Sequence, residues 1–545
     1  MKRHIHFIFI SFFCFNNIFA LTQFTKGVNL TNWFQAENIS QINFTKFTQE
    51  DFKYLKSIGS NIIRLPINFH AMIIDSSIFK IDPYIFFLLD KTCDWAEEEK
   101  INLIIDNHSI NQSSNLSINR SKNTEQNVEE ILIPIWKQIS EHFKNRTNLI
   151  YYEVLNEPHE ISNFNWNKIQ QKVVSEIRNI DSVHTIIVGA ANFNNYKDLD
   201  SLQLFDDKNI IYTFHFYEPF LFTHQGASWI NPSMEKVKNI PFPYSKEKMP
   251  YFDSSFSQTW IESIYNKYKI EGTNYNLSKL IQSIAKFKEE KNVEIFCGEF
   301  GSLKSNLENK GRNNWYKFIS ENFSKNNIPW TIWDFNGDFG LFNNNSKIDL
   351  NLLQSLDFTP ISYLKVISEN NEFNIFSDFT ESGIQPIKSN NKLNIKFSDE
   401  DKIEGDYSIL WKNAERYNSI SFDFLPDKEL EKLIDKNAAL KFSVKFSHQN
   451  IKIDLRFTDS KIDEKSDQAW RNSFPIISNE TNKWIDFFIP LKEFKESGAY
   501  ENGVWQNPKN NFDWQNVDKL EFVSEFESLL GKSIFIDDIK IIIPK

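Results

Sequence analysis

Residues 149–158 end in Glu153-Val154-Leu155-Asn156-Glu157-Pro158, which places the carboxylate of Glu157 directly after an apolar, strand-like run. More than a hundred residues later, Ile295-Phe296-Cys297-Gly298-Glu299-Phe300-Gly301 repeats this arrangement with Glu299. The strands of a closed β/α barrel all end at one rim, so residues that are far apart in the sequence meet there. The two runs therefore predict a barrel in which Glu157 and Glu299 face each other.

From about residue 24 to residue 369, strand-like runs alternate with amphipathic helical patterns, which is typical of parallel β/α architecture. The strand-like runs are residues 24–30, 61–67, 102–107, 149–155, 185–190, 209–216, 293–299 and 330–335. This pattern predicts an α/β fold with a (β/α)8 TIM barrel. The segment between residues 217 and 277 is too long for an ordinary connection, so we expect it to shape a cleft over the rim.

After residue 369 the pattern changes to short alternating strands with turns between them. Such a pattern predicts an antiparallel β-sandwich of jelly-roll type. We therefore divide the chain into a catalytic-type barrel over residues 21–369 and a sandwich over residues 370–545. A hinge is expected near residues 370–372.

The first twenty residues have the features of a signal peptide. Lys2 and Arg3 precede an apolar stretch from Ile5 to Phe15, and the segment ends at the small residue Ala20. The apolar stretch is shorter than the roughly 20 residues of a membrane-spanning helix. We predict that residues 1–20 are removed, that the protein is secreted, and that no membrane anchor remains after cleavage.

Charge and motifs exclude several other classes of protein. The net charge of the 545 residues is -11, whereas nucleic-acid binding requires clustered Lys and Arg side chains. The sequence contains no phosphate-binding loop, no dinucleotide-binding fingerprint and no Cys/His array at zinc spacing. We therefore expect no nucleic-acid partner, no cofactor and no metal.

The predicted strands end in further polar and aromatic side chains that would share the rim with the two glutamates. These are Arg64, His108, Asn156, His215, Tyr217 and Trp333. Two carboxyl groups on opposite sides of a sugar are what cleavage of a glycosidic bond requires. The ordered set closely resembles glycoside hydrolase family 5, the retaining, cellulase-like enzymes, over almost all of residues 24–345.

This resemblance implies that Glu157 is the acid/base and Glu299 the nucleophile. Carboxyl groups in such retaining sites lie about 5–5.5 Å apart, so their repulsion should raise the pKa of the acid/base. Arg64 is suited to favour the carboxylate form of Glu299, because its guanidinium is permanently charged. Tyr217 could donate a hydrogen bond to the same group.

The same resemblance implies sugar-binding roles for the remaining residues. Asn156 would bond the sugar 2-hydroxyl, and His108 and His215 would orient hydroxyl groups or tune Glu157. Trp333 would present an aromatic face to the sugar before the cleaved bond. Trp33, near the first strand, is a candidate for a farther subsite, with packing as the alternative.

The C-terminal sandwich resembles the galactose-binding-like jelly rolls that often serve as carbohydrate-binding modules. The resemblance depends on the closing run Ile534-Phe535-Ile536-Asp537-Asp538-Ile539. Tryptophans of this region that could stack on sugars are Trp411, Trp470, Trp484, Trp505 and Trp514. The alternative is a domain that only packs against the barrel.

Together these features predict a secreted retaining endo-β-glucanase that acts on a β-linked polysaccharide, most simply a β-1,4-glucan. Within the same reaction class, β-mannan, xyloglucan and β-1,3-glucan remain alternative substrates. A different class of function is a non-catalytic polysaccharide-binding or adhesion protein. Loss of either glutamate would be the sign of such a protein, and both are present.

Overall fold

The computed structural model describes residues 24–109, 124–304, 309–363, 373–389, 394–460, 469–501 and 504–544. The predicted signal peptide and the predicted hinge at residues 370–372 lie outside these ranges. In the part of the chain that the structure describes, no helix is both long and apolar enough to cross a bilayer.

The N-terminal part forms the predicted barrel. Its strands are β1 (Lys26–Asn29), β2 (Ile62–Ile67), β5 (Asn102–Asn107), β6 (Ile150–Glu153), β7 (Thr185–Gly189), β8 (Ile210–Phe216), β9 (Glu294–Phe300) and β10 (Trp330–Ile332). They close in the order β1-β10-β9-β8-β7-β6-β5-β2, and each neighbouring pair is parallel. The prediction of a (β/α)8 barrel is therefore confirmed.

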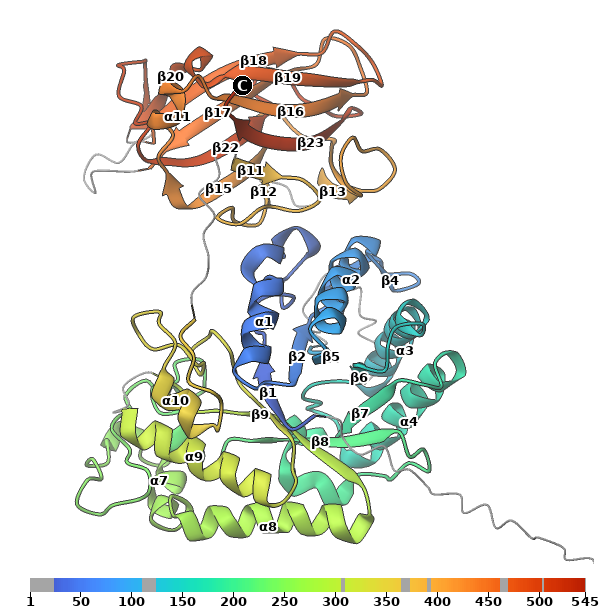
Figure 1. The fold of residues 1–545 in the computed structure, drawn as a ribbon, viewed down its shortest axis with the longest axis vertical. Coiled ribbons are helices and arrows are strands. Elements are labelled where there is room, and N and C mark those ends of the chain that lie inside the picture. The colour runs from blue at the N-terminus through green and yellow to red at the C-terminus, as the bar shows by residue number, and fades with distance from the viewer. Residues whose placement is uncertain are drawn as a thin grey trace, which may run out of the picture.

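Helices surround the barrel and connect its strands (Figure 1). They are α1 (Gln49–Ser57), α2 (Pro83–Glu98), α3 (Thr124–Phe143), α4 (Asn163–Ile180), α8 (Asn274–Lys291), α9 (Asn309–Lys325) and α10 (Leu350–Ser355). The long segment after β8 contains α6 (Phe220–Thr223) and α7 (Trp260–Glu271). A small hairpin, β3 (Ile73–Asp75) and β4 (Lys80–Ile81), precedes α2.

The barrel interior is layered, because side chains two positions apart on a strand point to the same side. A lower layer is apolar and includes Ile62 on β2 and Ile104 on β5. Two positions further along these strands are the buried charged residues Arg64 and Asp106. On β6, Tyr151 of the apolar layer is likewise followed by Glu153. An apolar plug thus supports a layer of buried charges below the rim.

The C-terminal part contains two antiparallel sheets. One sheet has the order β13 (Ile395–Ser398), β14 (Ser408–Lys412), β23 (Ser533–Ile542), β16 (Ala439–Phe446) and β19 (Trp484–Pro490), with β11 (Phe373–Phe376) also paired to β23. The other has the order β12 (Lys388–Ser389), β15 (Ser419–Lys428), β22 (Val517–Val523), β17 (Lys452–Asp459), β18 (Arg471–Ile477), β20 (Lys495–Glu501) and β21 (Val504–Gln506). Between β15 and β16 lies the one-turn helix α11 (Glu431–Asp435).

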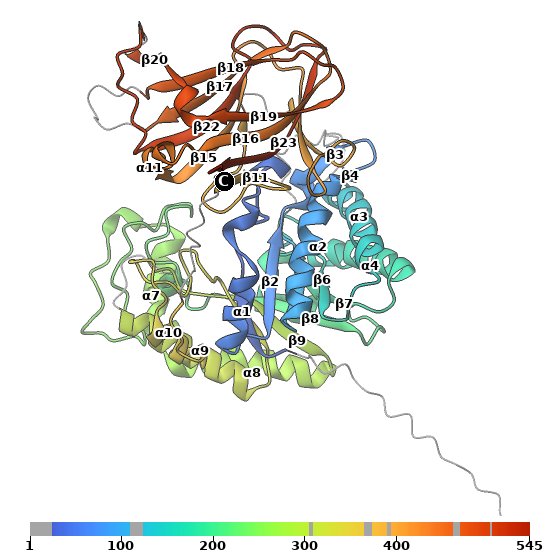
Figure 2. The same cartoon turned by 45° about the horizontal axis from the view of Figure 1, so that its top comes forward.

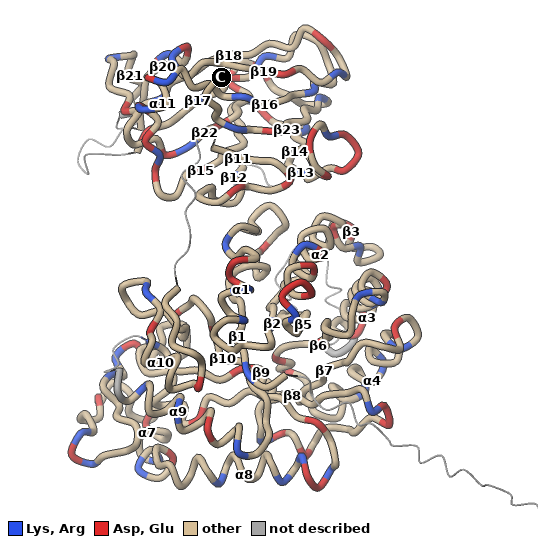
Figure 3. The backbone as a smooth tube through the Cα atoms, in the orientation of Figure 1, with Lys and Arg blue, Asp and Glu red and all other residues tan. Residues whose placement is uncertain are grey.

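The two sheets share one core, in which Phe442 of β16 meets Phe522 of β22 with ring centroids 5.4 Å apart. Of the sandwich tryptophans, Trp411 is buried in this core and is therefore not a sugar-binding side chain. Trp514 packs on Phe457. Lys and Arg are interspersed with Asp and Glu over both parts of the chain (Figure 3).

The sandwich is docked on the barrel beside α1 and α2 (Figures 1 and 2). Tyr84, in the first turn of α2, stacks on Phe397 with ring centroids 4.0 Å apart and meets Tyr407 edge-on at 4.8 Å. Its hydroxyl donates to the carbonyl oxygen of Asp378 at 2.6 Å. Because barrel helices begin at the rim where the strands end, the sandwich lies next to the rim that carries the predicted site.

Replacing Tyr84 with alanine should uncouple the two parts, because a buried ring that contacts both is lost. Truncating a buried aromatic side chain costs about 3–5 kcal/mol, whereas Tyr84→Phe loses only one hydrogen bond, worth about 1 kcal/mol. In scanning calorimetry we expect separated transitions for Tyr84→Ala and near wild-type unfolding for Tyr84→Phe. An alanine variant that unfolds like the wild type would show that the contact does not couple the domains.

Candidate active site

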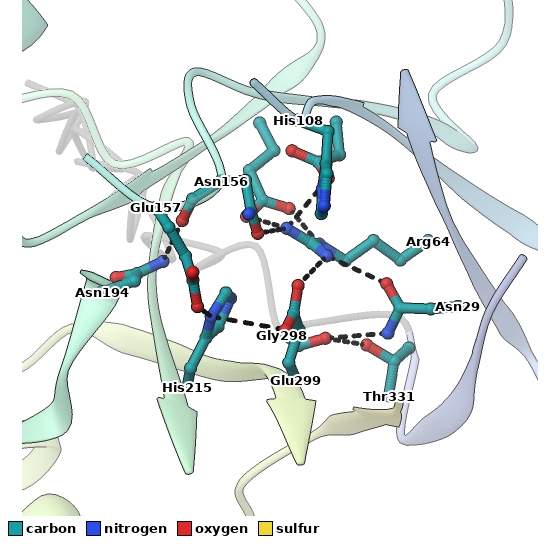
Figure 4. Close-up of polar contacts among 12 residues, drawn as sticks. Asn29, Arg64, His108, Asn156, Glu157, Asn194, His215, Gly298, Glu299 and Thr331 are labelled. Atoms are coloured by element: carbon teal, nitrogen blue, oxygen red, sulfur yellow. Dashed lines mark hydrogen bonds and ion pairs between the residues drawn. The ribbon is translucent and has the colours of Figure 1, made fainter. Parts of the chain in front are cut away.

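The guanidinium of Arg64 lies at the centre of the site, and its side chain is completely buried. Nε and Nη2 donate to the two oxygens of Glu153 at 2.7 and 2.9 Å, which is a bidentate pair. Nη1 donates to Oε1 of Glu299 at 2.9 Å (Figure 4). One buried cation thus connects the middle of β2 to the ends of β6 and β9.

The remaining contacts of Arg64 complete its surroundings. Nη2 donates to Oδ1 of Asn156 at 2.7 Å, and Nη1 donates to Oδ1 of Asn29 at 2.9 Å. Oδ2 of Asp106 is 3.0 Å from Nη2. Burial alone would lower the pKa of Arg64, but the carboxylates of Asp106 and Glu153 raise it well above its usual range. Arg64 therefore stays charged, and the hydrogen bonds from Nε, Nη1 and Nη2 fix the orientation of its guanidinium.

Glu299 accepts hydrogen bonds through both of its oxygens. Besides the bond from Arg64, the hydroxyl of Tyr217 donates to Oε2 at 2.8 Å. The backbone just before it is also held, because Asn29 Nδ2 and Thr331 Oγ1 both donate to the carbonyl oxygen of Gly298, at 3.1 and 2.6 Å (Figure 4). These bonds hold Glu299 with two donors facing its negative charge.

Glu157 lies opposite Glu299 and remains partly accessible, with 31% of its side chain exposed. Its Oε1 is 2.7 Å from Nδ1 of His215, and the same nitrogen is 3.6 Å from Oε2 of Glu299. One oxygen of Glu157 lies within 4.8 Å of one oxygen of Glu299. Burial raises the pKa of Glu157, although nearby His108 and Arg64 oppose the shift.

The two histidines of the site are neutral at ordinary pH. Burial lowers the pKa of His108 to about 4 and that of His215 to about 4. Nδ1 of His108 is 2.7 Å from Oδ2 of Asp106, and its ring is stacked against that of Trp333 at 5.4 Å with an interplanar angle of 7°. His108 and Asp106 thus form a chain of contacts from the ring of Trp333 to the guanidinium of Arg64.

These groups line a cavity of about 810 Å³ at the carboxyl ends of the strands. The long segment after β8 contributes His224, Trp229 and Ile230, which confirms the expectation that this segment shapes the cleft. From the side of β7 the cavity is lined by Asn192, Phe193 and Asn195. The site is thus a largely aromatic cleft whose lining includes Glu157 and Glu299.

The structure brings together eight of the nine side chains expected in the site. They are Arg64, His108, Asn156, Glu157, His215, Tyr217, Glu299 and Trp333. Of the two alternatives for Trp33, sugar contact or packing, the structure supports packing. Trp33 is 2% exposed, lies against Phe44 and Phe47, and donates through Nε1 to the carbonyl oxygen of Phe44 at 2.9 Å.

Three further residues orient Arg64 and were not expected from the sequence: Asn29, Glu153 and Asp106. For the two acidic residues the sequence did contain an indication. Glu153 and Asp106 are charged residues within otherwise apolar strands, two positions after residues of the apolar layer. A charge at such a position is retained only with a buried partner.

Glu157, His215 and Glu299 each bring one potential ligand atom to the same point, and among the described residues they form the cluster that could hold a metal ion. Both oxygens of Glu299 already accept hydrogen bonds, and the cationic Arg64 lies 2.9 Å away. A second positive charge is disfavoured beside that guanidinium. The cluster is better suited to proton transfer and nucleophilic chemistry than to metal binding.

A closed parallel barrel with two facing carboxyl groups is an arrangement that a glycoside hydrolase requires. Residues 23–339 match the family described as Cellulase (glycosyl hydrolase family 5). Because the match covers more than half of the chain, the chain belongs to glycosyl hydrolase family 5. The family expected from the sequence is confirmed.

Curated relatives include Endoglucanase 3 of Fibrobacter succinogenes, 28% identical over 61% of this chain and 52% of its own length. The chain thus spans about half of that protein. Endoglucanase C of Acetivibrio thermocellus is 27% identical over 60% of this chain and 96% of its own length.

Among solved structures, Thermotoga maritima Cel5A in complex with mannotriose has a TM-score of 0.51 at 24% identity, covering 61% of this chain and 97% of that one. This likeness concerns the fold alone. The cellulose synthase subunit Z of Clostridioides difficile has a TM-score of 0.51 at 25% identity and covers 61% of this chain and 99% of that one.

Replacing Arg64 with methionine should destabilise the barrel by about 3–5 kcal/mol, because buried carboxylates lose their cation. The pKa values of Asp106 and Glu153 are already raised by burial, and they would rise further without Arg64. The folded variant would then bind more protons than its unfolded chain between about pH 4 and pH 7, so its stability should fall as the pH rises. The loss relative to wild type should be larger at pH 7.5 than at pH 5 in urea titrations.

A matched control is Arg146→Met, because Arg146 also pairs with three carboxylates but keeps 21% of its side chain exposed. Ion pairs that solvent can screen contribute about 0–1 kcal/mol, so we expect a smaller loss that depends less on pH. Equal losses for the Arg64 and Arg146 variants, or a pH-independent loss for Arg64→Met, would contradict the role assigned to the buried cation.

Proposed function

We propose that this protein is a secreted, retaining endo-β-1,4-glucanase in which Glu157 is the acid/base and Glu299 the nucleophile. The observation that carries the proposal is the separation of the two carboxyl groups, which have oxygens within 4.8 Å of each other. Retaining glycosidases hold these groups about 5–5.5 Å apart, whereas inverting enzymes need about 6.5–9.5 Å to admit a water molecule. The predicted leader at residues 1–20 supports export.

The surroundings of the two glutamates support different roles for them. Glu299 faces the guanidinium of Arg64 and the hydroxyl of Tyr217, which stabilise a negative charge on its oxygens. Among the described residues no guanidinium or ammonium group is hydrogen-bonded to Glu157, and burial raises its pKa although His108 and Arg64 oppose the shift. We therefore assign proton donation to Glu157 and nucleophilic attack to Glu299.

The reaction has two displacement steps. In the first, Glu157 donates its proton to the glycosidic oxygen while an oxygen of Glu299 bonds to the anomeric carbon, so that the leaving sugar departs with that proton. In the second, Glu157 takes a proton from water, whose oxygen bonds to the anomeric carbon as the bond to Glu299 breaks. Two inversions give net retention.

Other side chains of the cavity are suited to bind the sugar ring that precedes the cleaved bond. Trp333 presents an aromatic face beside His108 at the cavity wall. Asn156 is held by Arg64 through its side-chain oxygen, which leaves its amide nitrogen as a donor for a sugar hydroxyl. The names of the curated relatives, Endoglucanase 3 and Endoglucanase C, favour a β-glucan as the substrate.

Replacing Glu299 with glutamine should abolish hydrolysis of soluble β-1,4-glucan, with a loss in kcat of at least about 10³-fold, because the amide cannot form the covalent intermediate.

Glu157→Ala should lose activity by about 10²–10⁴-fold, because the general acid and base is removed. Azide, which needs no proton from the enzyme base, should restore turnover of an activated aryl glycoside by Glu157→Ala and give the β-azide. Reducing-sugar release and NMR of the azide product measure these outcomes.

The matched control is Glu160→Gln, an exposed glutamate close to Glu157 in sequence that does not line the cavity, and it should retain wild-type rates. A Glu299→Gln variant that is folded and fully active would refute the assigned nucleophile. A wild type with no activity on any polysaccharide, but with measurable binding, would support the non-catalytic adhesion alternative instead.

We expect the highest kcat/KM on β-1,4-glucan in a panel that also contains β-mannan, xyloglucan and β-1,3-glucan. The expectation depends on the relatives' names, because the described cavity is lined by groups that contact sugars generally. Reducing-sugar release from purified polysaccharides at equal mass is the measurement. If the enzyme clearly prefers one of the other three polymers, that polymer becomes the assigned substrate, and the proposed mechanism is unchanged.

A further inference from the structure

The long segment after β8 brings one imidazole to the cavity wall that the proposed reaction does not use. His224 lines the cavity although only 9% of the residue is exposed. Burial lowers the pKa of His224 to about 3, so its ring is neutral at ordinary pH. A neutral imidazole has one nitrogen that donates a hydrogen bond and one that accepts. The neighbours of the ring decide which nitrogen does which.

The preceding residue, Thr223, fixes the tautomer of His224. Its hydroxyl donates to the carbonyl oxygen of Tyr217 at 2.6 Å, and the same oxygen is 3.0 Å from Nδ1 of His224. A hydroxyl has one hydrogen, and a carbonyl oxygen can only accept, so that hydrogen is committed to Tyr217. Nδ1 therefore carries the ring hydrogen and donates it to Thr223, which makes Nε2 the acceptor.

Packing holds the ring so that Nε2 is open to the cavity. The imidazole stacks on Phe220 with centroids 4.0 Å apart and planes 13° apart, and it meets Tyr217 edge-on at 5.1 Å. Among the described residues, no side chain or backbone group is hydrogen-bonded to Nε2 of His224. Nor is this atom sealed in the protein, as the unpartnered Nε2 of His215 is. It is an accessible acceptor in the wall of the cleft.

The other neighbours of the ring supply no donor. Phe339 and Trp229 meet it with ring centroids 5.6 and 6.5 Å away, and the hydroxyl of Tyr217 already donates to Glu299. An acceptor that is largely removed from water and left unpaired costs free energy, whereas a phenylalanine would fill the same space without that cost. The position is therefore suited to a donor that arrives with a ligand.

The neighbours also place His224 on the side of the cleft that holds the nucleophile. Tyr217 follows β8 and donates to Oε2 of Glu299 at 2.8 Å. Phe339 belongs to the segment after β10 that also carries Trp333, and β9, which carries Glu299, lies between β8 and β10. A donor that reaches Nε2 therefore belongs to the sugars bound on the Glu299 side of the cleaved bond.

We propose that Nε2 of His224 accepts a hydrogen bond from one hydroxyl of the sugars that remain attached to Glu299, and that this contact selects a glucan in which that hydroxyl is free. The inference rests on the proposed function of Glu299 as the nucleophile. Because Nε2 in this tautomer cannot donate, an oxygen that carries a substituent cannot replace the hydroxyl. A polymer that is etherified or glycosylated at that oxygen is therefore a poorer substrate.

The test uses the full chain and a series of 4-nitrophenyl β-cellobiosides from which one hydroxyl at a time has been removed. His224→Phe keeps the packing of the ring and lacks the acceptor, so kcat/KM on the parent glycoside should fall roughly three- to tenfold, the worth of one hydrogen bond. One member of the series should cost the wild type a similar factor. With that member His224→Phe should cause no further loss, because the bond is already absent.

Two further variants complete the design. His224→Gln brings an amide oxygen close to the position of Nε2 and should recover most of the lost kcat/KM. The matched control is His448→Phe, because Nδ1 of His448 is likewise 2.8 Å from the hydroxyl of the preceding residue, Ser447, but the residue is exposed in the sandwich. This control should match the wild type with every glycoside.

An unchanged kcat/KM of His224→Phe on the parent glycoside would overturn the inference. The same loss with every member of the series would also overturn it, because it would indicate a structural effect without a bond to any one hydroxyl. A wild type that hydrolyses neither the parent glycoside nor soluble β-glucan would instead refute the proposed function. The activity of the wild type thus distinguishes the two failures.

Discussion

The structure depends on one buried guanidinium. Arg64 connects β2 to β6 through Glu153 and to β9 through Glu299, and it holds Asn156 by a hydrogen bond at 2.7 Å. A charge in this position is stable only because carboxylates surround it, and the carboxylates are stable only because the cation is present. The site is therefore organised before any substrate arrives, which is how an enzyme favours charge that develops in the transition state.

The layering of the barrel explains why these charges lie between the apolar plug and the rim. Side chains alternate along each strand, so the apolar plug that contains Ile62 and Tyr151 is followed two positions later by Arg64 and Glu153. That alternation made much of the fold and the site predictable. Each strand is visible as an apolar run, and the expected functional residues other than Trp33 and Arg64 lie at or just after the end of such a run. Arg64 lies inside β2, below the rim.

The features that could not be predicted depend on contacts between distant segments. Trp33 has the residue type of a sugar platform, but Phe44 and Phe47 cover it, and only the fold reveals that. The left-handed conformation of Phe193 is likewise invisible in the sequence, because it is enforced by bonds to the segment after β6. Docking of the sandwich through Tyr84 depends on contacts with Phe397 and Tyr407, which are more than 300 residues away in the sequence.

The proposed mechanism requires that Glu299, held by Arg64 and Tyr217, forms a bond to the anomeric carbon. This bond can be detected by peptide mapping with mass spectrometry after inactivation with a 2-deoxy-2-fluoro-β-cellobioside. We expect a single adduct with the mass of one fluorinated cellobiosyl group on the peptide that contains Glu299. An adduct on the peptide that contains Glu157, or full inactivation without any covalent adduct, would contradict it.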